Sequence, residues 1–232
     1  MGKRVVLFDL GDTLVSYYRG GGFRPVLERC LATTYDCLLR LPLPAVPAPP
    51  NMEVAWAENV EAPDHRVTPL EERLDRIFRV DFSRLPVARR EAIAQAFLAP
   101  IFALGRPYSD TLPVLGRLRE RGQRLGIVSN TPWGSPSAPW RREVARHGLA
   151  DLCEYVGFCV DCGWRKPASQ PFVAALAYFG VRPDDCLFVG DNLRWDVEGA
   201  RAAGLDAVLL DRNGESPQVG VPRMTTLEDL LR

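Results

Sequence analysis

The sequence has no long hydrophobic run and no excess of charge of either sign. Although 47% of its 232 residues are hydrophobic, no apolar stretch approaches the roughly 20 residues that a membrane-spanning helix requires. Its 29 basic and 29 acidic residues cancel, so no global field draws the chain to nucleic acid or to an anionic membrane. The first residues also lack the pattern of a signal peptide. We therefore expect a soluble cytoplasmic protein with no nucleic-acid or membrane partner.

Cysteine and lysine are both scarce. Six irregularly spaced cysteines are too few for a disulfide scaffold in a chain of this length. Cys159 and Cys162 form a CxxC pair, with Cys153 nearby, but no second pair matches it, so reduced thiols are favoured over a zinc site. Among the 29 basic residues, only Lys3 and Lys166 are lysines. A lysine retained where arginine is the rule requires an explanation.

Short apolar stretches alternate with stretches of helical period over most of the chain. Strands are predicted at residues 5–10, 125–129, 155–160, 186–189 and 207–210. Helices are predicted between the later strands, at residues 112–121, 140–147, 170–179 and 195–203. Strands that are apolar throughout, separated by amphipathic helices, indicate an α/β fold with a Rossmann-like parallel sheet covered on both faces.

Residues 16 to about 105 interrupt this alternation. Helical patterns occur at residues 25–39, 51–60, 70–78 and 87–102, with no convincing strand between them. We therefore expect an α/β core domain formed by residues 1–18 and 106–232, and an inserted, mainly α-helical domain formed by residues 19–105.

Polar residues follow the carboxyl ends of the predicted strands. In an open parallel sheet these ends meet at one edge, where ligands bind. Asp9 ends the first strand, and Asp196 follows Asp191 after four intervening residues. The residues that we expect to converge are Asp9, Ser129, Asn130, Lys166, Asp191 and Asp196. Acids and a hydroxyl at the ends of three strands, with a rare lysine in the loop after another, indicate a site.

Four segments, in this order, resemble the motifs of the haloacid dehalogenase-like (HAD) hydrolases. They are VLFDLGDTLV at 6–15, LGIVSNT at 125–131, KP at 166–167 and FVGDNLRWD at 188–196. The resemblance implies a Rossmann-like core with a helical cap between the first and second motifs. It also implies a Mg²⁺-dependent phosphoric monoester hydrolase that acts through an aspartyl-phosphate intermediate.

The chemistry of these residues agrees with that activity. The Asp9 carboxylate would attack phosphorus, and positive charge must offset the meeting of two anions. Mg²⁺ prefers oxygen ligands, and the expected ligands are Asp9, the Gly11 carbonyl, Asp191 and Asp196, the last acting through water or by orienting Lys166. The residues expected to bind the phosphoryl group are Ser129, Asn130 and Lys166.

Gly11 departs from the family pattern. Active members usually carry an aspartate two residues after the nucleophile, where it protonates the leaving group and then activates water. General acid catalysis contributes about 10²- to 10⁴-fold in rate, so its loss should slow the hydrolysis of ordinary alkyl phosphates. Asp12, one residue later, either replaces this acid or only stabilises the turn.

Three functions therefore remain open. The first is a phosphatase for a small phosphorylated metabolite, the second a dehalogenase or phosphonatase, and the third a catalytically weak or inactive binding or regulatory protein, which Gly11 favours. Substrate selection is expected from the insert and the loop 131–140, where Trp133 and Trp140 either wall the site or cover the core edge. A monomer and a homodimer are both compatible with the sequence.

Overall fold

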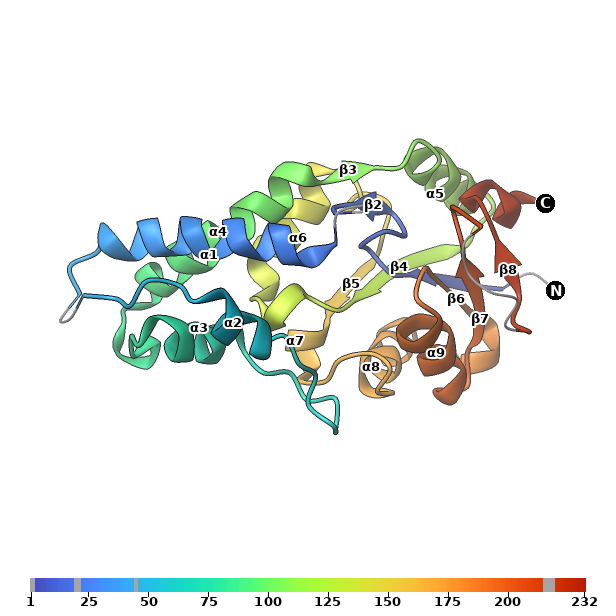
Figure 1. Ribbon diagram of the computed structural model, residues 1–232. Coiled ribbons are helices and arrows are strands. Elements are labelled where there is room, and N and C mark those ends of the chain that lie inside the picture. Colours follow the sequence, from blue (N-terminus) through green and yellow to red (C-terminus); the bar gives the residue numbers. More distant parts are fainter. Residues whose placement is uncertain (1–2, 19–21, 44–45, 215–219) are drawn as a thin grey trace.

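The computed structural model describes residues 3–18, 22–43, 46–214 and 220–232. Its centre is a six-stranded sheet in the order β5-β4-β1-β6-β7-β8 (Figure 1). Every neighbouring pair in it is parallel. The strands are β1 Val5–Phe8, β4 Arg124–Ser129, β5 Tyr155–Phe158, β6 Cys186–Gly190, β7 Asp206–Leu210 and β8 Arg223–Met224. The predicted α/β fold with a parallel sheet is confirmed.

Alternate side chains of β1 enter two different hydrophobic clusters. Val6 and Phe8 join the cluster that contains α5 (Thr111–Glu120) and α6 (Ser137–Arg146). Val5 and Leu7 join the cluster that contains α8 (Gln170–Phe179) and α9 (Gly199–Ala202). Successive residues of a strand point to opposite faces. The strand is apolar throughout because both of its faces are covered.

The main regular elements in the described part of the insert are helices joined by irregular segments. Its helices are α1 Phe23–Leu39, α2 Met52–Ala57, α3 Leu70–Phe78 and α4 Val87–Leu104. Helices α1 and α4 run side by side (Figure 1), and the Thr33 hydroxyl on α1 donates to the Ala96 carbonyl on α4 at 2.8 Å. The expected boundary at residue 19 lies outside the described residues, so the division into two domains stays a prediction.

A short antiparallel pair joins the two ends of the insert. Strand β2 (Val15–Ser16) pairs with β3 (Arg106–Pro107), with Val15 opposite Pro107. The chain therefore leaves the sheet after β1 and returns beside the same point. Two-residue strands carry no readable period, so the sequence did not predict this pair.

Several details of the sequence prediction were wrong, among them the ends of the strand expected at 5–10, which stops at Phe8, and of the helix expected at 51–60, which stops at Ala57. The strand expected at 155–160 ends at Phe158, because Cys159–Cys162 forms the short helix α7, and the Asp161 carboxylate accepts a hydrogen bond from the Phe158 amide at 2.8 Å. The helix expected at 195–203 begins earlier, as the π-helical segment Leu193–Glu198 that leads into α9. Strand β8 was not predicted.

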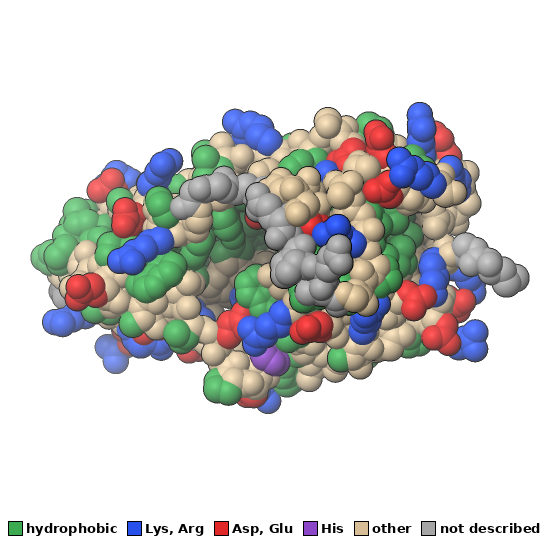
Figure 2. All heavy atoms as spheres, turned by 45° about the vertical axis from the view of Figure 1, so that its right-hand side comes forward, with side chains coloured by type: hydrophobic (Ala, Val, Ile, Leu, Met, Phe, Trp, Pro, Cys, Tyr) green, Lys and Arg blue, Asp and Glu red, His purple; other side chains and the backbone are tan. Residues whose placement is uncertain are grey.

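The surface carries charges of both signs. On the face drawn in Figure 2, Lys and Arg side chains are interspersed with Asp and Glu side chains rather than segregated. Among the described residues, no helix has both the length and the hydropathy needed to cross a membrane.

Candidate active site

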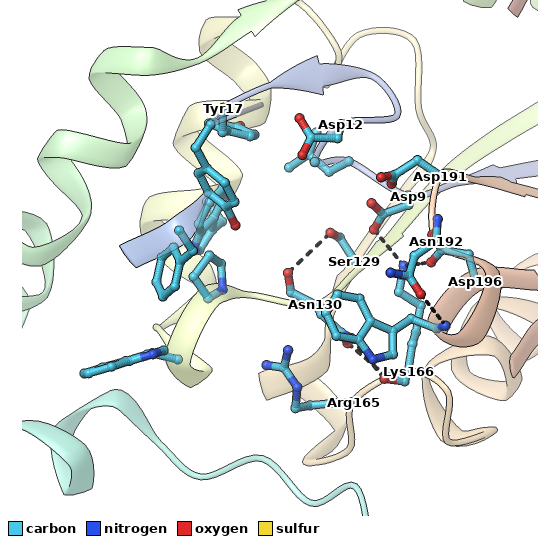
Figure 3. Close-up of a pocket in the computed structure, with 18 of the residues that line it drawn as sticks. Asp9, Asp12, Tyr17, Ser129, Asn130, Arg165, Lys166, Asp191, Asn192 and Asp196 are labelled. Atoms are coloured by element: carbon cyan, nitrogen blue, oxygen red, sulfur yellow. Dashed lines mark hydrogen bonds and ion pairs between the residues drawn. The ribbon is translucent and has the colours of Figure 1, made fainter. Parts of the chain in front are cut away.

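The carboxyl ends of β1, β4 and β6 open into a cavity of about 390 Å³ (Figure 3). Residues of the insert, among them Phe23 and Asn59, also line it. All of the expected site residues lie on its wall: Asp9, Gly11, Asp12, Ser129, Asn130, Lys166, Asp191 and Asp196. Residues that are up to 187 positions apart in sequence are therefore brought to one edge of the sheet.

Lys166 is buried at the centre of this group. Its side-chain ammonium donates to Asp9 Oδ1 at 2.6 Å, to Asp196 Oδ1 at 2.6 Å and to the Val128 carbonyl at 2.9 Å. Burial alone would lower the pKa of Lys166, but the adjacent carboxylates of Asp196 and Asp9 outweigh it and raise the pKa. The lysine therefore stays charged with all three of its donors used, a geometry that suits a compact ammonium better than a planar guanidinium.

Asp196 is held from two sides. Its Oδ1 accepts from Lys166, and its Oδ2 accepts from the Asn192 amide at 3.0 Å. Burial raises the pKa of Asp196 to about 6, although Lys166 opposes the shift. A Cβ atom on Gly190, at the end of β6, would lie 2.3 Å from Asp196 Oδ2. Only glycine leaves room for this carboxylate.

Three carboxylates meet beside the lysine. Oxygens of Asp9, Asp191 and Asp196 lie within 4.8 Å of one another, and among the described residues they are the only such group of possible metal ligands. Burial, and then the charges of Asp196 and Asp9, raise the pKa of Asp191 well above its usual range, while the Thr13 hydroxyl donates to Asp191 Oδ1 at 3.1 Å. One ammonium cannot neutralise three carboxylates, and clustered oxygen donors fit a hard divalent cation.

The turn after β1 has its acid, and not its glycine, in the left-handed conformation. Asp12 has a φ of 57°, in the left-handed region that aspartate tolerates better than most residues. Gly11 does not need this conformation, and a Cβ atom on it would meet only Tyr17 Cδ2, at 3.9 Å. Asp12 thus forms the turn and lines the cavity at once.

Ser129 and Asn130 differ in what they offer a ligand. The Ser129 hydroxyl makes one long contact, 3.5 Å to the Asn130 carbonyl. The Asn130 side chain is occupied, because its Oδ1 accepts from the Lys166 amide at 2.9 Å and its Nδ2 donates to the Lys166 carbonyl at 3.1 Å. Asn130 therefore fixes the loop that carries the lysine, while its expected contact with substrate stays a prediction.

The expected loop 131–140 ends earlier, because α6 begins at Ser137. Trp133 in this loop and Trp140 in α6 both line the cavity and are buried. Trp133 stacks on Phe97 of α4 at 5.6 Å, and its Nε1 donates to Asn59 Oδ1 at 2.9 Å. Trp140 packs edge-on against Tyr17 at 5.6 Å. The two roles weighed for these rings therefore coincide, because they wall the cavity and also fill the contact between core and insert.

Among the described residues, no group of three or more possible metal ligands includes the CxxC pair. The Cys159 sulfur accepts a hydrogen bond from the Thr131 amide at 3.2 Å. The Cys162 thiol lies 3.5 Å from the Cys159 and Trp164 carbonyls. Cys159 thus contacts the loop after β4, whereas the contacts of Cys162 are local to α7 and the residues that follow it.

Sequence reasoning missed several residues of the cavity wall. They are Tyr17, Tyr18, Phe23, Asn59, Arg165 and Trp195. Arg165 had a signal, because it directly precedes the one unusual lysine. Trp195 had one too, because it lies inside the FVGDNLRWD motif. Phe23 and Asn59 belong to the insert, and Tyr17 and Tyr18 to the chain that leads into it, so their positions depend on how the insert folds.

The fold and the site together define a class of protein. This class is the Rossmann-like α/β proteins that gather carboxylates around one buried lysine at the carboxyl edge of the sheet, with a helical insert over that edge.

The chain belongs to the haloacid dehalogenase-like hydrolase family, whose model matches residues 3–204. The resemblance drawn from the four sequence motifs is confirmed.

Named relatives and a solved structure agree with this assignment. A glyceraldehyde 3-phosphate phosphatase of Methanopyrus kandleri is 34% identical over 141 residues, which cover 56% of this chain and 59% of that protein. A protein of the same name from Pyrococcus abyssi is 29% identical over 206 residues, which cover 88% of this chain and 80% of that protein. The crystal structure of a HAD phosphatase from Thermococcus onnurineus matches with a TM-score of 0.68 and 25% identity, covering 98% of this chain and 95% of that one.

Proposed function

We propose that this protein is a Mg²⁺-dependent phosphatase that hydrolyses a small phosphorylated metabolite through an aspartyl-phosphate on Asp9. The observation that carries the proposal is the convergence of Asp9, Lys166 and Asp196, joined by two contacts of 2.6 Å at the edge of the sheet. The relatives named as glyceraldehyde 3-phosphate phosphatases support a small phosphorylated substrate.

The residues present fit a magnesium ion. Asp9 and Asp191 would be its side-chain ligands, because one oxygen of each accepts no hydrogen bond from the described residues. The Gly11 carbonyl is the proposed backbone ligand. Asp196 has both oxygens occupied, so we assign it to orienting Lys166 and to contact with the ion through water. A bound Mg²⁺ supplies positive charge where two anions must meet.

In the proposed first step, an Asp9 carboxylate oxygen attacks phosphorus while the bond from phosphorus to the leaving oxygen breaks. The Lys166 ammonium and the Ser129 hydroxyl stabilise the charge on the phosphoryl oxygens. In the second step, water attacks the phosphorus of the aspartyl-phosphate and releases inorganic phosphate and free Asp9. Position 11 offers no general acid for the leaving group or the water, and Asp12, which lines the cavity one residue later, is the alternative donor.

The insert completes the proposed site. We assign residues 19–105 to a cap domain and residues 1–18 and 106–232 to the core, because Phe23 and Asn59 of the insert share the cavity with the catalytic group. The hydrogen bond from Trp133 to Asn59 links the two parts directly over the cavity.

The decisive test is Asp9→Asn, assayed on p-nitrophenyl phosphate with Mg²⁺ and with EDTA. The variant should lose the activity, because an amide is a poor nucleophile, and EDTA should remove it from the wild type. Asp151→Asn, at an exposed aspartate, is the matched control and should retain full turnover. Equal activity of Asp9→Asn and wild type would refute the mechanism.

Gly11 favours one second candidate, a protein that binds a phosphorylated ligand without turning it over, because the usual proton donor is missing at that position. Mg²⁺-dependent binding of phosphate, without hydrolysis of any phosphate ester including the aryl ester, would decide for this candidate.

A further inference from the structure

Arg165 is placed on the cavity wall by contacts that fix its backbone and one of its nitrogens. Its amide donates to the His65 carbonyl at 2.8 Å, which ties the residue to the insert. Its Nη1 donates to the Thr131 carbonyl at 2.9 Å. Figure 3 shows the guanidinium pointing into the cavity from below Asn130, on the side away from Asp12 and Asp191.

Arg165 differs from Lys166 in having no acid partner. These two are the basic residues among the described residues that line the cavity. Lys166 is paired with two carboxylates, whereas no described acid forms a salt bridge with Arg165. Its Nε is buried and has no acceptor among the described residues. With Nη1 bound to Thr131 and Nε buried, Nη2 is left to donate to an oxygen of a carboxylate or phosphate.

A second guanidinium makes this side of the cavity more positive. Arg73 is buried behind Trp133, with its guanidinium carbon 5.8 Å from the ring centroid. Burial lowers the pKa of Arg73; Glu58 opposes this, and the charge of Arg165 lowers the pKa further. The cavity is thus polarised, with the aspartates on one side and Arg165 on the other.

We propose that Arg165 binds a second acidic group of the substrate, so that the preferred substrates are phosphate esters whose alcohol part carries a carboxylate or another phosphate. This inference rests on the proposed phosphatase function. The phosphoryl group occupies the end of the cavity beside Asp9 and Lys166, and the second anion meets Nη2 of Arg165. An uncharged leaving group leaves that guanidinium without a partner, which costs affinity.

Matched substrate pairs test this preference. In the first pair, 3-phosphoglycerate carries a carboxylate where glyceraldehyde 3-phosphate carries an aldehyde; in the second, ribulose 1,5-bisphosphate carries a phosphate that ribulose 5-phosphate lacks. Arg165→Gln should reduce kcat/KM for the acidic member of at least one pair roughly 10- to 150-fold more than for its partner, the range expected for hydrogen bonds to a charged group. The pair affected identifies the anion. Arg165→Lys keeps the charge but loses the planar guanidinium, so its effect on kcat/KM should lie between those of the wild type and Arg165→Gln.

Arg194→Gln is the control, because Arg194 is exposed near the same edge of the sheet and is paired with Glu61 at 3.4 Å. This change should leave the selectivity ratios as in the wild type. If Arg165→Gln lowers both members of both pairs equally, Arg165 only supports the loop through Thr131, and the inference is overturned.

Binding measured without turnover separates this inference from the proposed function. By calorimetry with Mg²⁺, 3-phosphoglycerate and ribulose 1,5-bisphosphate are titrated into Asp9→Asn and into Asp9→Asn combined with Arg165→Gln. The added change should weaken binding of at least one of them roughly 10- to 150-fold, and equal affinities for both would overturn the inference. Failure of the wild type to hydrolyse any phosphate ester would refute the phosphatase proposal, while these affinities would still decide the role of Arg165.

Discussion

Exchanging Gly11 and Asp12 should restore the missing general acid. The double variant Gly11→Asp, Asp12→Gly places a carboxylate at position 11, where a Cβ atom has no neighbour closer than 3.9 Å. It also places glycine where φ is 57°, which removes a left-handed backbone cost of about 1–2 kcal/mol for an ordinary L-residue and less for aspartate. The structure therefore accommodates both changes.

The gain should depend on the leaving group. General acid catalysis contributes about 10²- to 10⁴-fold, which corresponds to about 3–5 kcal/mol of the barrier. A nitrophenolate leaves without a proton, so its ester should gain little, whereas an alkoxide requires one and its ester should gain most. The assay is kcat/KM across aryl and alkyl phosphates, plotted against leaving-group pKa.

The plot for the double variant should be flatter than that for the wild type. Asp12→Gly alone is the control, because it relieves the backbone without supplying an acid at position 11. Parallel plots for the wild type and the double variant would refute the account of Gly11, and would mean that Asp12 or another group already protonates the leaving oxygen.

Two further predictions concern stability. Gly190→Ala should destabilise the protein by about 1–3 kcal/mol in urea unfolding and should lower phosphatase turnover, because the new methyl would lie 2.3 Å from Asp196. The control is Gly116→Ala, where nothing lies within 4 Å; it should reduce neither stability nor turnover. Burial raises the pKa of Asp110, but hydrogen bonds, led by the one from Arg212, outweigh burial and lower the pKa. The ionised carboxylate therefore stabilises the fold above the usual aspartate pKa. This stabilisation is lost as the pH falls through the lower pKa of the folded state. Asp110→Asn should therefore cost about 3 kcal/mol near pH 7, with a smaller difference from wild type in acid; a pH-independent difference would contradict the argument.

Much of the core could be predicted because its signals are local. The run from Val5 to Phe8 is apolar on both strand faces, which identifies a covered parallel strand wherever it lies. The rule that strand ends meet at one edge then predicted that Asp9, Lys166 and Asp191 would converge, and the structure brings them to one cavity.

Contacts between distant segments could not be predicted in the same way. From the sequence alone, the side chain of Asn130 could bind a ligand or hold a loop. In the folded chain, both of its polar atoms form hydrogen bonds with the backbone of Lys166. Likewise, β2 and β3 are too short to show a period, although their pairing fixes where the insert leaves and rejoins the core.

The amino-acid sequence by itself determined the parallel sheet, the family and the residues that end its strands, because periodicity and motif order are properties of neighbouring residues. The tertiary structure decided which charges are paired. Lys166 is enclosed by carboxylates, while Arg165, its neighbour in sequence, faces the same cavity with no carboxylate of the described residues paired to it. Side chains of adjacent residues reach different surroundings, and only packing in three dimensions sets the distances on which their electrostatic interactions depend.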